Sequence, residues 1–330
     1  MKKTFAFILV FSLFTNAYGA LAKKLIPVGE TIGIAIMTDG ILVIDTQEVV
    51  DKNGNKKCPG KSAGIKAGDC IISADGNKIK STEELSEYIN TRENDIVITI
   101  KRNDTVLNTI VSPAKCPDGI KLGLWVRDST AGLGTLTFVD PENKTFGALG
   151  HGISDIDTDT MLSCREGNIL TCAQDNAIPG KKGTPGELNG RFSSEILGNF
   201  KKNSNSGIFG KFTSNNIISE QNAIDTASFS EIREGEAKIL SDVDGKGVLE
   251  YSIQIKKINE KNIEGKNLVF RVTDQDLISK TGGIVQGMSG SPIVQNGKLV
   301  GAVTHVFVND PTRGYGIFIE NMLAEAEKIK

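Results

Sequence analysis

The sequence predicts a mainly β protein built from two domains. Glycine accounts for 36 of the 330 residues and proline for only 9, an excess of glycine that indicates many tight turns between short strands. From residue 122 onward, short runs rich in Val, Ile, Phe and Thr alternate with Gly, Asn and Asp, whereas helical periodicity is scarce before residue 319. This pattern favours a barrel or sandwich. At about 100–200 residues per domain, the length suggests two domains.

The composition limits the possible chemistry. Hydrophobic residues make up 39% of the chain, enough for a buried core. The net charge is −2 and no long basic run is present, so nothing is available to neutralise a phosphate backbone and nucleic acid is not an expected partner. The chain contains two histidines. Any reaction that needs an imidazole must therefore use His151 or His305.

The first 22 residues predict export. Lys2 and Lys3 precede an apolar run over residues 5–14, and small residues follow in NAYGALA, the order found in secretory signals. The run is shorter than the ~20 residues that a membrane-spanning helix needs. We therefore expect residues 1–22 to be a signal peptide, cleaved after Gly19 or Ala22, with an uncleaved membrane anchor as the alternative.

Five cysteines follow without CxxC spacing, so they predict neither a zinc site nor a thioredoxin-like motif. Cys164 and Cys172 flank a turn-like Glu-Gly-Asn and could face each other across a hairpin, or could remain small buried thiols. The other three are Cys58, Cys70 and Cys116.

Residues 25–112 are expected to form the first domain. Strands over 33–36 and 40–44 surround a turn at Thr38-Asp39, and SAGIKAGD precedes a tight turn at 75–77. Ser81-Thr82-Glu83-Glu84 is a capping box that opens a helix, and strands over 96–101 and 105–111 complete the unit. The segment resembles a PDZ domain of the bacterial HtrA type, chiefly through SAGIKAGD.

The PDZ resemblance implies a binding site for a peptide C-terminus. It places the carboxylate-binding loop at Thr31, Ile32, Gly33 and Ile34, with the peptide added as a strand beside residues 33–36 and against the helix 83–89. The alternative is that the PDZ fold serves only as a scaffold or restrains its own chain.

The second domain, residues 115–330, carries the predicted chemistry. In Gly287-Met288-Ser289-Gly290 the glycines let the backbone turn sharply and expose the serine hydroxyl. An α/β-hydrolase elbow would need a helix after the serine and an acid before a downstream histidine, and the sequence provides neither. A trypsin-like order, with the histidine upstream and a β-hairpin at Asn296-Gly297 after the serine, fits.

This order selects His151, which lies between glycines in GALGHGI, as the general base. His305 lies in the alternating run GAVTHVFV and is expected to be a packed or hydrogen-bonded strand residue. The backbone N–H groups of Gly287 and Ser289 are predicted to form the oxyanion hole.

An aspartate cluster follows His151 and imitates a calcium loop. Asp155, Asp157 and Asp159 precede Glu166 at the twelfth position, but the sixth position is Thr160 where the sharp turn requires glycine. We therefore predict no metal site and no cofactor.

At full length the sequence resembles the SpoIVB peptidases, which combine an N-terminal hydrophobic segment, a PDZ domain and a trypsin-like double β-barrel. The resemblance rests on LGLWVRDSTAGLGTLTFVDP, FGALGHGISDIDT and VTDQDLISKTGGIVQGMSGSPIVQNGKLVGAVTHVFVNDPTRGYGIFIE. It implies His151 as base, Ser289 as nucleophile and Asp274 as the acid, which either orients His151 or supports the Ser289 loop.

The resemblance also implies a role. Such a peptidase is exported into the space between the two forespore membranes during sporulation, cleaves itself, and cuts a membrane-bound regulator of an intramembrane protease. This releases activation of a late sigma factor. Two alternatives remain open: an HtrA-like quality-control protease, and an exported PDZ adaptor without activity.

Overall fold

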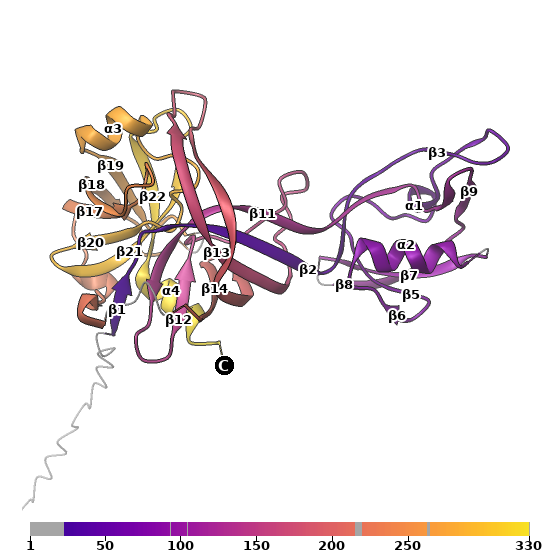
Figure 1. The fold of residues 1–330 in the computed structure, drawn as a ribbon, viewed down its shortest axis with the longest axis horizontal. Helices are drawn as coiled ribbons and strands as arrows, with labels where there is room; N and C mark the ends of the chain where they lie inside the picture. Colours follow the sequence, from indigo (N-terminus) through magenta and orange to yellow (C-terminus); the bar gives the residue numbers. More distant parts are fainter. Residues whose placement is uncertain (1–22, 93, 104, 215–219, 263–264, 330) are drawn as a thin grey trace, which may run out of the picture.

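The computed structural model describes residues 23–329 apart from 93, 104, 215–219 and 263–264. The expected signal peptide lies outside these residues. The described chain forms two lobes joined by a narrow neck (Figure 1). Within the described residues, no helix is both long and apolar enough to cross a membrane.

The smaller lobe is the PDZ lobe. Its sheet runs from β2 through β5 and β7 to β8, and Ile41, Val43 and Ile98 lie in its core. Helix α2 begins at the predicted capping box, where Ser81 Oγ accepts a hydrogen bond from the Glu84 N–H. The elements of this lobe are β3 (Val49–Val50), β4 (Lys56–Lys57), α1 (Pro59–Ser62), β5 (Cys70–Ala74), β6 (Asn77–Lys78), α2 (Thr82–Asn90), β7 (Ile96–Arg102), β8 (Thr105–Val111), β9 (Ala114–Cys116) and β10 (Gly119–Lys121).

The larger lobe contains two six-stranded units. In the first, β11, β12, β15, β14, β13 and β2 pair in that order, and pairing between β2 and β11 closes the ring. Its elements are β1 (Lys24–Pro27), β2 (Thr31–Thr46), β11 (Leu124–Val139), β12 (Thr145–Ala148), β13 (Cys164–Ile178), β14 (Glu187–Ser204), β15 (Gly207–Phe212), η1 (Glu220–Asn222) and β16 (Ile224–Asp225).

The second unit is a closed barrel with the order β17, β18, β19, β22, β21 and β20. Its elements are η2 (Phe229–Glu231), β17 (Gly235–Ser241), β18 (Leu249–Ile258), β19 (Leu268–Val272), α3 (Gln275–Thr281), β20 (Pro292–Gln295), β21 (Lys298–Val306), β22 (Arg313–Phe318) and α4 (Ile319–Ala326). The predicted class, a mainly β chain with a PDZ domain and a trypsin-like double barrel, is confirmed.

Two long strands form the neck, and this differs from the sequence prediction. The strands expected over 33–36 and 40–44 are one continuous strand, β2, with no turn at Thr38-Asp39. Its first half pairs with β11 and β13 of the larger lobe, and its second half pairs with β5 of the PDZ lobe. Residues 24–38 therefore lie in the larger lobe, although they were expected to begin the PDZ domain.

The cysteines also differ from the hairpin expectation. Cys164 and Cys172 both lie on β13, so the Glu-Gly-Asn between them is strand and cannot turn one thiol toward the other. All five cysteines are free thiols.

Candidate active site and peptide groove

The loop that carries Ser289 is shaped by two glycines with positive φ. Gly287 has φ +95° and Gly290 has φ +101°, values that are strained for any residue with a Cβ. A Cβ on Gly290 would lie 2.1 Å from the carbonyl oxygen of Thr135 and 2.6 Å from the nitrogen of Leu149. Glycine is required at 290 because the two barrels meet there.

Thr135, on β11, holds this loop through two hydrogen bonds. Its N–H donates to the Ser289 carbonyl at 2.9 Å, and its Oγ1 donates to the Gly287 carbonyl at 2.8 Å. The Met288 and Gly290 N–H groups donate to Val285 and Val303. Among the described residues, the N–H groups of Gly287 and Ser289 find no acceptor, as the predicted oxyanion hole requires.

His151 follows β12 in a tight bend formed by Leu149 (φ +71°) and Gly150 (φ +70°). Its Nδ1 lies 2.8 Å from the carbonyl oxygen of Gly152. Because a carbonyl can only accept, Nδ1 carries the proton and Nε2 of the neutral ring is left to accept one. Burial lowers the pKa of His151, and the hydrogen bond to Gly152 opposes this. The ring is therefore neutral near pH 7.

Ser289 and His151 line one cleft of about 450 Å³, together with apolar side chains of Ile34, Leu133 and Leu149. Ser289 Oγ donates to the carbonyl of Thr304 at 2.6 Å. The hydroxyl must leave this carbonyl and turn to Nε2 before attack, a change that substrate binding often completes.

The structure places His305 beside the predicted base. Its ring centroid lies 4.8 Å from that of His151, with 34° between the planes. The residue as a whole is exposed, but its imidazole is desolvated. This desolvation lowers the pKa of His305 to about 4, with smaller effects of the charge that His151 carries when protonated and of the charge of Lys266. His305 lies on strand β21, as expected, and its neutral ring packs beside the base.

Asp274 is not brought to His151. It is the N-cap of α3, where its carboxylate accepts from the N–H groups of Asp276 and Leu277 at 3.1 Å each and from that of Ser252 at 3.2 Å. It does not line the cleft. The hydrogen bonds of Asp274 are those of a helix cap and a contact to Ser252, and the group hydrogen-bonded to Nδ1 of His151 is the Gly152 carbonyl. The catalytic role that the resemblance implies for Asp274 stays a prediction.

Residues Thr31–Ile34 do not form a carboxylate-binding loop, contrary to expectation. They lie in the first half of β2, where Ile34 pairs with Gly132 on one side and with Ile169 on the other. Strand pairing uses the N–H groups that a carboxylate would need, and Ile32 and Ile34 are buried.

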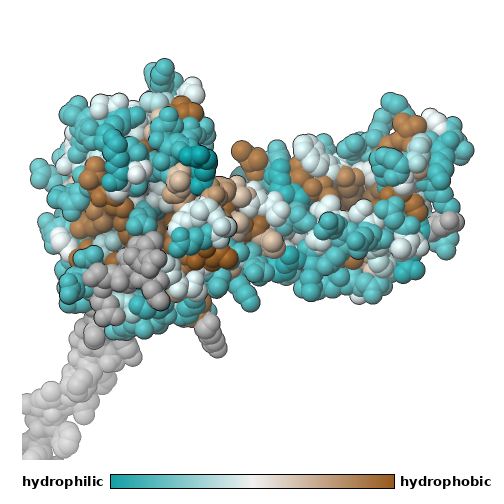
Figure 2. Space-filling model, viewed as in Figure 1, coloured by the Kyte–Doolittle hydropathy of each residue, from teal (hydrophilic) through white to brown (hydrophobic). Residues whose placement is uncertain are grey.

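A groove of about 350 Å³ lies elsewhere on the PDZ lobe, between α2 and the start of β11. Leu85 and Ile89 of α2 face Leu124 and Val126 of β11 across it. Figure 2 shows apolar side chains on this lobe over the region where β11 and α2 run in Figure 1. β11 here pairs antiparallel with β2, Leu124 opposite Thr46.

The loop before β11 closes one end of the groove. Gly123 has φ +65°. In the described part of the chain, neither the Leu122 nor the Gly123 N–H has an acceptor. Sequence reasoning assigned LGLWV only to the second domain, although an apolar-Gly-apolar step before a strand could have indicated such a loop.

Comparisons with known proteins agree with this architecture. A PDZ domain model matches residues 39–102, and the model of SpoIVB peptidase S55 matches residues 118–323. None of the curated proteins compared matches the chain.

Three solved structures are remotely similar. The PDZ domain of an SdrC-like protein from Listeria monocytogenes is 23% identical, with 28% of this chain and 90% of that chain covered and a TM-score of 0.23. The HtrA-type protease AlgW with decapeptide is 13% identical, with 64% and 57% covered and a TM-score of 0.36. An inactive form of Rv3671c from M. tuberculosis H37Rv is 10% identical, with 60% and 81% covered and a TM-score of 0.30.

The fold, the serine loop and the family match define a PDZ-containing serine endopeptidase. The chain belongs to the SpoIVB peptidase S55 family.

Proposed function

We propose that this endopeptidase is exported, cleaves itself and then cuts a membrane-bound regulator of an intramembrane protease during sporulation, in the space between the forespore membranes. The observation that carries the proposal is Ser289 and His151 on one cleft in a member of the SpoIVB family. The signal-like order of residues 1–22 supports export.

In the proposed reaction, Nε2 of His151 accepts the Ser289 proton while Oγ attacks the scissile carbonyl. The N–H groups of Gly287 and Ser289 hold the oxyanion. His151 then donates its proton to the leaving amine. Water next attacks the acyl-enzyme carbonyl while His151 accepts its proton, and His151 returns that proton to Ser289 Oγ as the acid product leaves. The Gly152 carbonyl keeps the ring in the required tautomer.

We further propose that the groove between α2 and β11 binds an extended segment, either a protein C-terminus or part of this chain. The N–H groups of Leu122 and Gly123 are available for a terminal carboxylate, and Leu85, Ile89 and Val126 provide an apolar wall for the side chains. The segment would add as a strand beside Leu124.

The test compares the full chain with Ser289→Ala. A fluorophosphonate should label only the unsubstituted chain, and mass spectrometry should find self-cleavage sites that the variant lacks. Labelling of Ser289→Ala at the same rate would refute the assignment of the nucleophile. Cleavage of casein at many sites would favour quality control, whereas one or two sites in a single partner would favour signalling.

A further inference from the structure

Strand β11 connects the peptide groove to the catalytic loop. Leu124 and Val126 line the groove, residues 130–133 line the catalytic cleft, and Thr135 holds the Ser289 loop. Figure 1 shows the strand running through the neck from one lobe to the other. Any change at the groove end of β11 therefore acts on a strand that also forms the cleft.

We propose that Arg127, between these two ends of β11, is a positioning residue that couples occupancy of the groove to the loop carrying His151. The proposal rests on the proposed peptide binding in the groove. Arg127 lines the same cleft as Ser289 and His151, but its guanidinium donates to Asp155 and Asp157 and to neither of those two side chains. It therefore acts through Asp155, four residues after His151.

The guanidinium of Arg127 bridges two carboxylates of the His151 loop. NH1 bonds to Asp155 Oδ2, and NH2 lies 3.0 Å from Asp157 Oδ2. The Asp155 side chain is fully buried, whereas that of Asp157 is 43% exposed. A buried carboxylate needs its cation, so the loop must follow Arg127 when β11 moves.

The second oxygen of Asp155 fixes the shape of the loop. Asp155 Oδ1 accepts hydrogen bonds from the Asp157 N–H, the Thr158 N–H and Thr158 Oγ1 at 3.0–3.1 Å. These contacts explain the aspartate cluster that imitates a calcium loop in the sequence. Asp155 serves as the centre of a folded turn, and Arg127 is its cationic partner.

Asp128 connects the same point of β11 to the groove helix. Its Oδ2 accepts a hydrogen bond from the Thr82 N–H, the first residue of α2, at 2.7 Å. The pairing of β11 with β2 shifts register between Trp125 and Val126 and again between Arg127 and Ser129. Such irregularities allow a strand to change its local bend. A ligand that moves α2 or Leu124 thus acts on a strand segment that can adjust.

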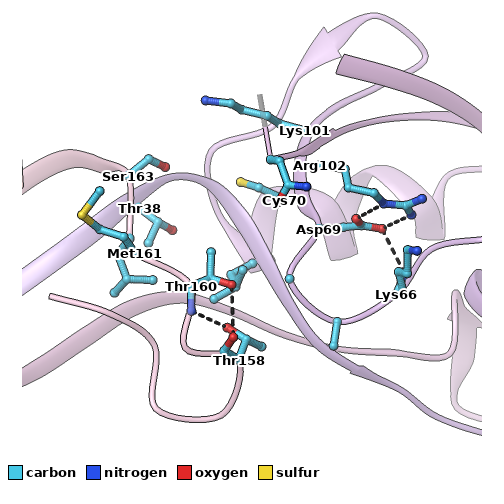
Figure 3. Close-up of a pocket in the computed structure, with 15 residues that line it drawn as sticks. Thr38, Lys66, Asp69, Cys70, Lys101, Arg102, Thr158, Thr160, Met161 and Ser163 are labelled. Carbon is cyan, nitrogen blue, oxygen red and sulfur yellow. Dashed lines mark hydrogen bonds and ion pairs between the residues drawn. The ribbon is translucent and has the colours of Figure 1, made fainter. Parts of the chain in front are cut away.

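The far side of the His151 loop also meets the PDZ lobe. A pocket of about 430 Å³ separates Thr158, Thr160 and Met161 from Gly68 and Cys70. Figure 3 shows the two threonines on one side and the ion pair of Asp69 with Arg102 on the other. The pocket leaves space beside this part of the loop.

The test measures the rate at which a fluorophosphonate labels Ser289 in the full chain. The probe is a pool of labelled hexapeptides ending in Leu, Ile, Val or Phe with a free carboxylate, whose binding is followed by fluorescence anisotropy. Bound peptide is expected to change the labelling rate by about fivefold or more, the lower range of allosteric coupling. Arg127→Gln should bind the peptides with unchanged affinity and show no change in rate.

Three variants make the result specific. Arg127→Lys keeps a cation for Asp155 but cannot bridge both carboxylates. This variant should fold and should lose most of the change in labelling rate on peptide binding, so it provides the test if Arg127→Gln is unstable. Ser86→Arg, on the exposed side of the groove, should abolish binding and response together. Arg191→Gln removes an exposed pair with Asp175 and should behave as the unsubstituted chain.

The outcomes separate the two proposals. A full response in both Arg127 variants, or no response to bound peptide in the unsubstituted chain, would overturn the role of Arg127. No peptide binding would overturn the groove and the coupling with it. Ser289 labelling reports the peptidase itself in every case.

Discussion

Replacing Thr135 with Val tests whether β11 holds the oxyanion loop. The two side chains have nearly the same shape, but Val removes the 2.8 Å hydrogen bond to the Gly287 carbonyl. Thr135 is fully buried, so the carbonyl is left without this partner, at a cost of about 1–3 kcal/mol in the free energy of unfolding. Gly287 also carries one of the two N–H groups that are predicted to form the oxyanion hole. Loss of one such donor lowers kcat by about 10²–10³, and misplacing it should slow Ser289 labelling by at least about tenfold.

Thr137, two residues along the same strand, is the matched control. It is equally buried, but its Oγ1 has no hydrogen-bond partner among the described residues. Thr137→Val should therefore be neutral or stabilising, by up to about 1–3 kcal/mol, with unchanged labelling. Urea unfolding and fluorophosphonate kinetics on both variants give the comparison. Equal stability and equal labelling rates in Thr135→Val and Thr137→Val would refute the conclusion that Thr135 holds the Ser289 loop in place.

Three further predictions concern the site. Gly290→Ala should abolish labelling and destabilise the chain by more than about 2 kcal/mol. Gly297 also has a positive φ, +75°, but a Cβ there would meet open space, so Gly297→Ala should cost only the backbone strain. Equal effects of the two substitutions would contradict the argument that a Cβ at 290 clashes with Thr135 and Leu149. The lowered pKa of His151 keeps the base neutral in mild acid. The rate of Ser289 labelling should therefore rise with pH, with the midpoint of the rise below pH 6.5. A midpoint above pH 6.5 would refute the argument that burial lowers this pKa. Asp274→Asn preserves the helix cap and should label within a few-fold; a loss of about 10⁴ would restore Asp274 as the orienting acid.

Features that depend on interactions between neighbouring residues were predicted correctly from the sequence. The capping box opens α2, and the glycines around Ser289 produce the expected sharp loop. Chain order predicted that His151 and Ser289 would meet, and they line one cleft. The helix start and the sharp loop depend on residues that are close in the sequence, and the meeting of His151 with Ser289 follows from the trypsin-like chain order. None of these predictions required knowing which distant strands pair.

The pairing of distant strands could not be predicted from neighbouring residues alone. Thr38-Asp39-Gly40 has the composition of a turn, and Gly40 does adopt φ +110°, yet β2 continues through it. Strands β11 and β13, about 90 and 130 residues away, cover both edges of its first half and stabilise the extended form. The groove strand was misassigned for the same reason. The expected strand 33–36 is used by the larger lobe, and residues 124–127 take its place beside α2.

The orientation of His151 by a carbonyl has a chemical consequence. A carboxylate partner would raise the pKa of the imidazole and stabilise the imidazolium formed during attack, whereas the Gly152 carbonyl carries no net charge. His305 is neutral and also adds no opposite charge. The base is therefore available but weak, and Ser289 rests against Thr304 rather than Nε2. We expect such a site to have a low basal rate that depends on the position of the His151 loop. Arg127 and Asp155 connect that loop to the strand that lines the peptide groove.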